Sequence, residues 1–183
     1  FYTIINHEPF EMRGSYLARW ASPSTTGLPN YQIQHHVDQR FDADGALRGD
    51  FINIAALVDG EHVYMYGTGA YRASPVHLAR KRLDSLASEG GYERFDAATR
   101  TWVGPRVATT PIVPTPSIGE LSVRCFPEID RYVMLDQEVS AGNRIAARFA
   151  EAPEGPWSDP VTVATMEDPA FRTRHCCNGT DCP

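Results

Sequence analysis

Hydrophobic positions between residues 51 and 95 follow the patterns that are typical of β-strands. Residues 51–58 are almost continuously apolar, as expected for a strand that is buried on both faces. Asp59-Gly60 is a hairpin turn signal, and residues 62–67 then alternate valine and methionine with tyrosine. Residues 75–80 and 92–95 complete a group of four short predicted strands.

A second group of four strands is predicted further along the chain, and it repeats features of the first. The segments Ser15–Ala21, Val76–Arg82 and Arg144–Ala150 resemble one another. The apolar segments that start at Asp50 and Glu120 also match, and each is headed by an acidic residue. Such internal similarity is typical of repeat architectures. The strands of the second group run over 121–126, 131–135, 144–149 and 161–164.

Residues 75–89 also carry a helical signal. Ser74 and Pro75 could begin a helix, and the apolar positions that follow them have helical spacing. The counterparts of this segment in the repeat lack that spacing, so we predict a strand over 75–80. A short helical turn is predicted over Leu83–Ser88.

Four-stranded units of about 60 residues match the blades of a β-propeller, so we predict an all-β fold of this kind. Propellers have roughly four to eight blades, and a chain of 183 residues supplies only about three. We therefore expect residues 1–169 to form an incomplete propeller that belongs to a longer protein. Residues 170–183 are expected to be a disordered or aberrant tail.

The charge and composition of the chain exclude several classes of partner and ligand. The formal net charge is −6 and no basic cluster occurs, so we expect no nucleic acid partner. No apolar run approaches the roughly 20 residues of a membrane helix, so we expect no membrane insertion. Cys176, Cys177 and Cys182 lie near the end of the chain without the spacing of a zinc site. We predict no metal ion and no cofactor.

Asp50 and Glu120 are the candidate catalytic residues, because each heads the innermost predicted strand of its blade. Innermost strands begin near the axis of a propeller, so we expect the two carboxylates to face a common hollow. A pair of carboxylates at short range is what glycoside hydrolysis requires. The alternatives are structural: Asp50 would close a turn with Gly49, and Glu120 would cap a strand after Gly119.

The polar loop at residues 67–75 provides the first candidate groups for binding a substrate. Its glycines allow a ligand to approach the backbone closely. Tyr71 could stack on a sugar face, and Arg72 and Ser74 could hydrogen-bond to hydroxyl groups. The alternative is an ordinary loop between two strands of a hairpin.

Three further polar residues are candidate binding groups. Ser122 and Arg124 share a strand face with Glu120, because side chains two residues apart point the same way in a strand. Asn53 lies in the strand that Asp50 heads. An ion pair without a role in binding is the alternative for Arg124.

Three motifs, taken together, resemble a known family. They are Gly-Thr-Gly-Ala-Tyr-Arg-Ala-Ser-Pro-Val from Gly67, Gly-Glu-Leu-Ser-Val-Arg from Gly119 and Gly-Pro-Trp-Ser-Asp-Pro from Gly155. The family is a bacterial group long filed as a domain of unknown function, and some of its members are regarded as endo-D-arabinanases. The resemblance covers residues 51–163 and, more loosely, the unit before them.

The resemblance implies a five-bladed propeller that is secreted or held in the cell envelope and that cuts the D-arabinan of the actinobacterial cell wall. The chain departs from the family in two places. The N-terminal blades, which usually carry a key aspartate, are absent, and the resemblance ends after Pro169.

Two functions follow as expectations, and both have a polysaccharide as partner. The first is a glycoside hydrolase, or the C-terminal part of one, that acts on a furanoside polysaccharide and has a second carboxylate upstream of Phe1. The alternative is a non-catalytic carbohydrate-binding propeller. A truncated product without a stable fold is a third possibility.

Overall fold

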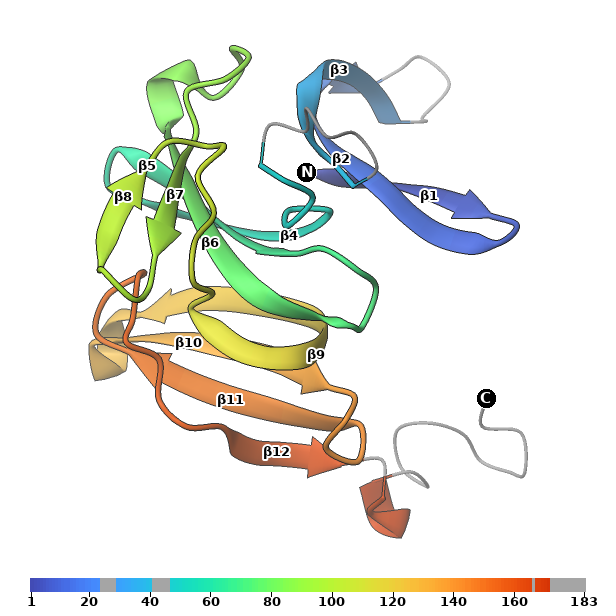
Figure 1. Ribbon diagram of the computed structural model, residues 1–183, viewed down its shortest axis with the longest axis vertical. Coiled ribbons are helices and arrows are strands. Elements are labelled where there is room, and N and C mark those ends of the chain that lie inside the picture. The colour runs from blue at the N-terminus through green and yellow to red at the C-terminus, as the bar shows by residue number, and fades with distance from the viewer. Residues whose placement is uncertain (24–28, 41–46, 166, 172–183) are drawn as a thin grey trace.

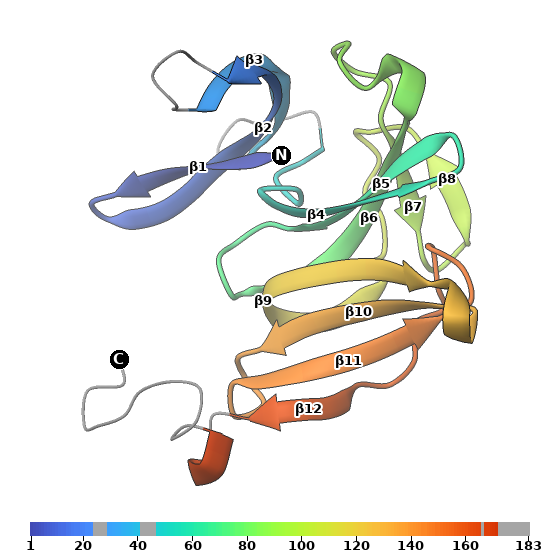
Figure 2. The ribbon, with the colours of Figure 1, turned by 180° about the vertical axis from the view of Figure 1, so that it is seen from behind.

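The computed structural model describes residues 1–23, 29–40, 47–165 and 167–171, and antiparallel β-strands dominate it. Helical structure in this part of the chain is limited to single turns such as Leu83–Ser85 and Pro127–Ile129. None of its helices is long and apolar enough to cross a membrane. The strands form three successive antiparallel units (Figures 1 and 2). The all-β prediction is therefore confirmed.

The first unit is a three-stranded sheet of β1 (Tyr2–His7), β2 (Phe10–Pro23) and β3 (Pro29–Gln39). Side-chain hydroxyl groups attach it to the segment that precedes the second unit. Ser15 Oγ donates to the carbonyl oxygen of Phe51 at 2.5 Å, and Thr3 Oγ1 donates to that of Ile52 at 3.0 Å. The unit has one strand fewer, within the described residues, than the four predicted for a blade.

The second unit places its strands side by side in chain order. These are β4 (Asn53–Asp59), β5 (His62–Thr68), β6 (Ser74–Arg82), β7 (Glu93–Asp96) and β8 (Thr101–Val103). The first four coincide with the predicted strands, and β6 confirms a strand where local propensity favoured a helix. The predicted helical turn appears as Leu83–Ser85. The short strand β8 was not predicted.

The third unit is a four-stranded antiparallel sheet in chain order. Its strands are β9 (Val113–Phe126), β10 (Arg131–Glu138), β11 (Arg144–Ala150) and β12 (Val161–Thr165). Strand β9 begins at residue 113, whereas the sequence predicted a start at residue 121. Its first part pairs with β6 of the second unit, through Ser74 opposite Ile118 and Val76 opposite Val113. This pairing links distant segments, so the local pattern did not reveal it.

Apolar side chains fill the space on both faces of the second unit. One cluster lies between the first and second units: Val37, Leu47, Phe51, Val63, Met65, Ala79 and Tyr92. The other lies between the second and third units: Tyr64, Tyr66, Val76, Leu78, Phe95, Val113, Ile118, Val123 and Met134. The hydroxyl of Tyr66 donates to the carbonyl oxygen of Pro153 at 3.0 Å and so adds a polar contact to the second cluster.

The sequence repeat is correct for strands but not for side-chain directions. Arg80 and Arg148 occupy the third strands of their units, β6 and β11, as the repeat predicts. Both side chains nevertheless border the cluster between these units: Arg80 lies over the Trp102 ring, and Arg148 pairs opposite Met134. The Arg80 side chain therefore points from the second unit toward the third, and the Arg148 side chain points from the third unit back toward the second. An offset of one residue in the alignment of the repeats explains this difference, because neighbouring residues of a strand point to opposite faces.

The arrangement of the units as propeller blades is not established by the fold. The third unit is the predicted four-stranded antiparallel meander, whereas the second unit has a fifth strand, β8. Pairing of β6 with β9 joins the two units into one nine-stranded sheet, and this sheet does not close on itself within the described residues. The predicted tail falls mostly on residues 172–183, which lie outside the described residues together with Cys176, Cys177 and Cys182.

Replacing Gly67 with alanine is expected to destabilise the protein by about 1–3 kcal/mol. A Cβ atom at this position would overlap the ring of Phe51 and would approach the Asp50 carbonyl oxygen to 2.8 Å. Denaturant unfolding of Gly67→Ala measures the change in free energy. Gly104→Ala is the matched control, because its Cβ would meet only one atom, at 4.0 Å. Equal destabilisation of both variants would contradict this packing.

Candidate functional site

The loops at one end of the second and third sheets carry the predicted site residues. Strand pairing defines this end, because Asn53 lies opposite Thr68, Ser74 opposite Ile118 and Glu138 opposite Arg144. We call it the site end. The loops of an antiparallel meander alternate between its two ends. Ile118 of β9 lies opposite both Ser74, at the start of β6, and Glu138, at the end of β10, so the β5–β6 and β10–β11 loops are both at the site end.

A buried carboxylate shapes the segment that leads into β4. Asp38, at the end of β3, accepts hydrogen bonds from the backbone N–H groups of Leu47 at 3.1 Å and Phe51 at 3.0 Å. Burial raises the pKa of the Asp38 carboxyl group, although the backbone hydrogen bonds oppose that effect. Because the N–H groups of Leu47 and Phe51 both donate to it, Asp38 fixes the segment between these two residues, which presents Asp50.

Asp50 is held by a buried arginine. Its Oδ2 atom lies 2.6 Å from Nη2 of Arg94, whose side chain is 1% exposed, whereas the Asp50 side chain is 30% exposed. Arg94 also donates to the carbonyl oxygen of Leu47 at 2.8 Å and to Thr109 Oγ1 at 3.0 Å. Asp50 is thus the counter-ion of a buried cation and still reaches solvent. This structural role as a counter-ion differs from the turn with Gly49 that was the alternative for Asp50, and it leaves part of the carboxylate accessible.

His77 completes the polar cluster around Asp50. Its Nε2 atom lies 3.9 Å from Asp50 Oδ1, and its Nδ1 atom lies 3.4 Å from Thr109 Oγ1. Burial lowers the pKa of His77; the charge of Arg94 lowers it further, and Asp50 opposes both. The cluster therefore combines a carboxylate, a buried cation and an imidazole that favours its neutral form.

The β5–β6 loop is compact and lies against the Asp50 segment. The N–H of Gly69 donates to Ser74 Oγ at 2.9 Å, and Ser74 Oγ in turn donates to the Pro75 carbonyl oxygen at 3.1 Å. A Cβ atom on Gly69 would come within 2.5 Å of the Gly49 carbonyl oxygen, so only glycine fits this approach. The Ser74 hydroxyl is engaged in shaping the loop, which supports a positioning role for a residue predicted to bind substrate.

From this loop, Tyr71 contacts the first unit and Arg72 contacts the third. The Arg72 guanidinium lies 4.8 Å from the centre of the Tyr71 ring, and Phe10 packs edge-on against the same ring at 5.0 Å. Arg72 Nη2 lies 3.3 Å from both carboxylate oxygens of Glu120. The structure therefore brings together three of the predicted residues, Tyr71, Arg72 and Glu120.

Glu120 differs from Asp50 in its surroundings. Its side chain is 58% exposed and its partner Arg72 is 38% exposed, so solvent screens this ion pair. Glu120 lies within β9, whereas Asp50 precedes β4, so the two residues do not occupy equivalent positions in their units. Gly69 contacts the Asp50 segment and Arg72 contacts Glu120, so the β5–β6 loop lies between the two carboxylates.

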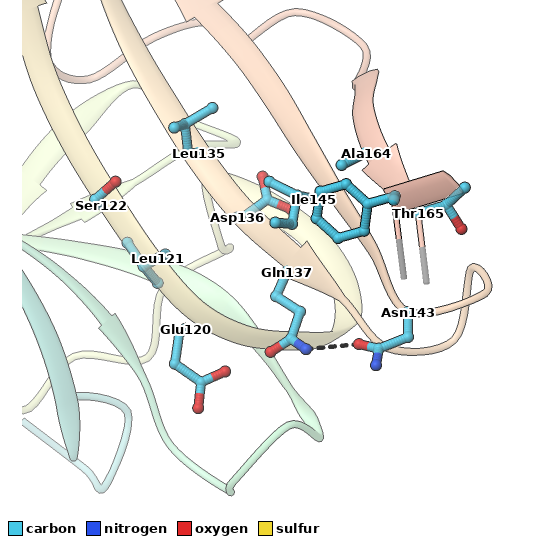
Figure 3. Close-up of a pocket in the computed structure, with 11 residues that line it drawn as sticks. Glu120, Leu121, Ser122, Leu135, Asp136, Gln137, Asn143, Ile145, Ala164 and Thr165 are labelled. Carbon is cyan, nitrogen blue, oxygen red and sulfur yellow. Dashed lines mark hydrogen bonds between the residues drawn. The ribbon is translucent and has the colours of Figure 1, made fainter. Parts of the chain in front are cut away.

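A cavity of about 420 Å³ opens beside Glu120 on the third sheet (Figure 3). Its wall is apolar, with Leu121, Leu135 and Ile145 among the lining residues. Its polar lining comes from Glu120, Ser122, Asp136, Gln137, Asn143 and Thr165. An apolar wall with a few polar groups is the usual composition of a small-molecule site.

The remaining predicted binding residues are placed differently. Ser122 lines the cavity opposite Leu135, as its strand face predicts. Arg124 is exposed on β9 opposite Val133, two pairs further from the site end than Ser122, and is not among the residues that line the cavity. Asn53 begins β4 opposite Thr68, close in sequence to Asp50.

Sequence reasoning missed four residues of this region. Arg94 and His77 around Asp50 come from β7 and β6, and no local pattern pairs them with a loop before β4. Gln137 and Asn143 border the β10–β11 loop, which corresponds in the repeat to the β5–β6 loop. That correspondence is the signal that could have identified them. No three His, Cys, Asp or Glu side chains in the described ranges converge as metal ligands.

Comparison with known proteins places the chain among its relatives. The sequence model of a family described as "Domain of unknown function (DUF4185)" matches residues 16–173. A comparison with curated proteins found no match. The crystal structure of a "putative hydrolase" from Bacteroides ovatus is similar, with a TM-score of 0.59 and 17% sequence identity. At this identity the similarity shows a shared fold.

The similar region is a small part of the Bacteroides ovatus protein. It covers 85% of the present chain but 38% of that protein's chain. The chain therefore spans less than half the length of this structural relative.

The free energy of unfolding is expected to fall as the pH is lowered from about 7.5 to 5.5, in part because of His77. The folded state lowers the pKa of His77 below its usual value of 6.5, so the unfolded chain binds the proton more readily. Denaturant unfolding across this pH range is the measurement. The free energy of unfolding of His77→Gln should fall less over this pH range than that of the wild type. The pKa of His35 is also lowered, but His35 is present in both proteins and so contributes equally to both curves. Parallel pH curves would contradict the expectation.

Proposed function

Because the chain belongs to the family described as Domain of unknown function (DUF4185), we propose that it is part of a β-propeller glycoside hydrolase. The proposed substrate is a furanoside polysaccharide of the D-arabinan type, as the three sequence motifs imply. The description of the Bacteroides ovatus relative as a hydrolase is consistent with this reaction class. A cell-wall substrate implies a secreted or cell-envelope location.

The stacking of the sheets supports the propeller architecture. The second and third units are consecutive antiparallel meanders of five and four strands, and they bury their facing sides as blades do, although β6 also pairs with β9 at one end. The third unit exposes several large apolar side chains: Leu135, Ile145, Phe149, Val161 and Val163. A further sheet in a longer protein would cover them. The length of the Bacteroides ovatus chain supports such an extension.

The observation that carries the proposed activity is the position of Glu120. Its exposed carboxylate lies at the edge of the cavity, next to an arginine and a tyrosine that can contact a sugar. A glycosidase requires a carboxyl group that protonates the leaving oxygen, and we assign this role to Glu120. Tyr71 would stack on a sugar ring, and Arg72 and Ser122 would hydrogen-bond to its hydroxyl groups.

The second carboxylate of the mechanism must be ionised, either as nucleophile or as general base. Asp50 is the candidate within this chain, because its carboxylate pairs with the Arg94 guanidinium and is partly open to solvent. The β5–β6 loop lies between Asp50 and Glu120, and Asp50 does not line the cavity beside Glu120, so this role requires the substrate to reach past that loop. An aspartate or glutamate from another part of the longer protein is the alternative source of this group.

A non-catalytic carbohydrate-binding function is the second candidate, and one observation favours it. Both candidate carboxylates already pair with arginine, Glu120 with Arg72 and Asp50 with Arg94. A carboxylate that is paired with arginine lacks the apolar surroundings of a typical catalytic acid. Binding alone needs the aromatic and hydrogen-bonding groups but no proton transfer.

Glu120→Gln separates the two candidates. If Glu120 is the acid/base, the variant should lose D-arabinan cleavage by about 10²–10⁴-fold and should still bind the polysaccharide. Reducing-end release measures cleavage, and affinity electrophoresis in D-arabinan measures binding. Glu128→Gln is the control, because Glu128 is also exposed but lies in the turn after β9, away from the site end.

Each outcome of this experiment supports or rejects an assignment. Unchanged cleavage by Glu120→Gln would exclude Glu120 as the acid. Binding without cleavage in the wild type, in a form that includes the remaining part of the longer protein, would establish the binding function instead. Absence of both from that form would reject the carbohydrate proposal.

A further inference from the structure

Two neutral amide side chains border the cavity and have no role in the function proposed above. Gln137 is near the end of β10, and Asn143 is the last residue before β11. In Figure 3 both lie at the same end of the cavity as Glu120. Their position beside the proposed acid raises the question of what they bind.

The two amides form one hydrogen-bonded unit. Gln137 Nε2 donates to Asn143 Oδ1 at 2.6 Å. This bond leaves one further group unused on each amide. On Gln137 it is the side-chain carbonyl oxygen, and on Asn143 it is the amino group. The pair therefore presents one acceptor and one donor on adjacent side chains.

The backbone holds this pair in place. Asn143 has a φ of 51°, in the left-handed region that asparagine adopts more readily than most residues. Its N–H donates to the Val139 carbonyl oxygen at 3.3 Å, which closes the β10–β11 turn. Buried ion pairs anchor both sides of that turn, because Glu138 accepts hydrogen bonds from Arg144 and Arg148. A preorganised donor and acceptor lose little entropy when they bind a ligand.

Gly119 makes room for the Gln137 side chain over β9. A Cβ atom on Gly119 would lie 2.7 Å from Gln137 Oε1 and 3.3 Å from Arg72 Cγ. The absence of a side chain at this position thus lets the amide approach the strand that carries Glu120. Gln137, Arg72 and Glu120 consequently meet around one glycine.

The chemistry of the cavity matches a carbohydrate ring. A sugar has an apolar C–H face and a rim of hydroxyl groups that both donate and accept. The cavity offers an apolar wall and a neutral donor–acceptor pair, and its volume of about 420 Å³ lies within the range of ligand sites. We propose that Gln137 and Asn143 bind neighbouring hydroxyl groups of the sugar unit that lies next to Glu120. This assignment rests on the proposed function and names two of its specificity-determining residues.

The test removes each amide while preserving the local structure. Asn143→Gly retains freedom in the left-handed backbone region, and Gln137→Met retains the length of an unbranched side chain. Gln34→Ala removes a partly exposed amide from β3 and serves as the matched control. The probe is a set of D-arabinan oligosaccharides, with binding measured by titration calorimetry and folding checked by thermal unfolding.

Loss of one hydrogen bond is expected to raise the dissociation constant by up to about tenfold in each amide variant. The double variant should lose less than the product of the two single effects, because the amides act as one unit. The control should bind as the wild type does. Where the wild type also cleaves the probe, the KM should rise more than the kcat falls.

Two results would overturn the assignment, and they are distinguishable. If the wild type binds and both amide variants fold and bind equally well, Gln137 and Asn143 do not contact the sugar and the proposed function stands. If the wild type binds no oligosaccharide, even in the form that includes the rest of the longer protein, the proposed function fails and this inference fails with it.

Discussion

The structure depends on the burial of both faces of the second sheet. Strand β5 shows this most directly, because Val63 and Met65 enter the cluster shared with the first unit, while Tyr64 and Tyr66 enter the cluster shared with the third. Alternate residues of a strand point to opposite faces, so one seven-residue strand contributes to two cores. This double burial sets the second sheet between its two neighbours and so gives the loops at the site end their positions.

The β5–β6 loop brings the candidate site residues together, because the packed second sheet fixes its position. Its two ends are fixed by the sheet, and between them Gly69 contacts the backbone before β4 while Arg72 reaches β9. Residues from all three units therefore meet there, since Phe10 of β2 packs against Tyr71. A change in the stacking of either neighbouring unit would separate these groups, although none of them belongs to the apolar clusters.

The sequence was sufficient for features that repeat or alternate over several residues. The eight strands of the two predicted groups follow from apolar alternation and from internal similarity, and similarity also excluded a helix at Pro75. It could not place individual side chains, as Arg80 and Arg148 show, because one residue of offset reverses the face. It also could not find the pairing of β9 with β6 or the contact of Arg94 with Asp50. Both join segments that are distant in the chain and unrelated in pattern.

The two candidate carboxylates illustrate how one residue type takes two roles according to burial. Arg94 is almost fully buried, so loss of Asp50 would leave a cation without its counter-ion, at a cost of about 3–5 kcal/mol. Glu120 pairs in solvent, where such an ion pair contributes little to stability. Activity lost on changing Asp50 would therefore mix folding with chemistry, whereas activity lost on changing Glu120 would report chemistry. In the proposed function, a substrate could therefore displace Arg72 from Glu120 at little cost in stability, whereas displacing Arg94 from Asp50 would be costly.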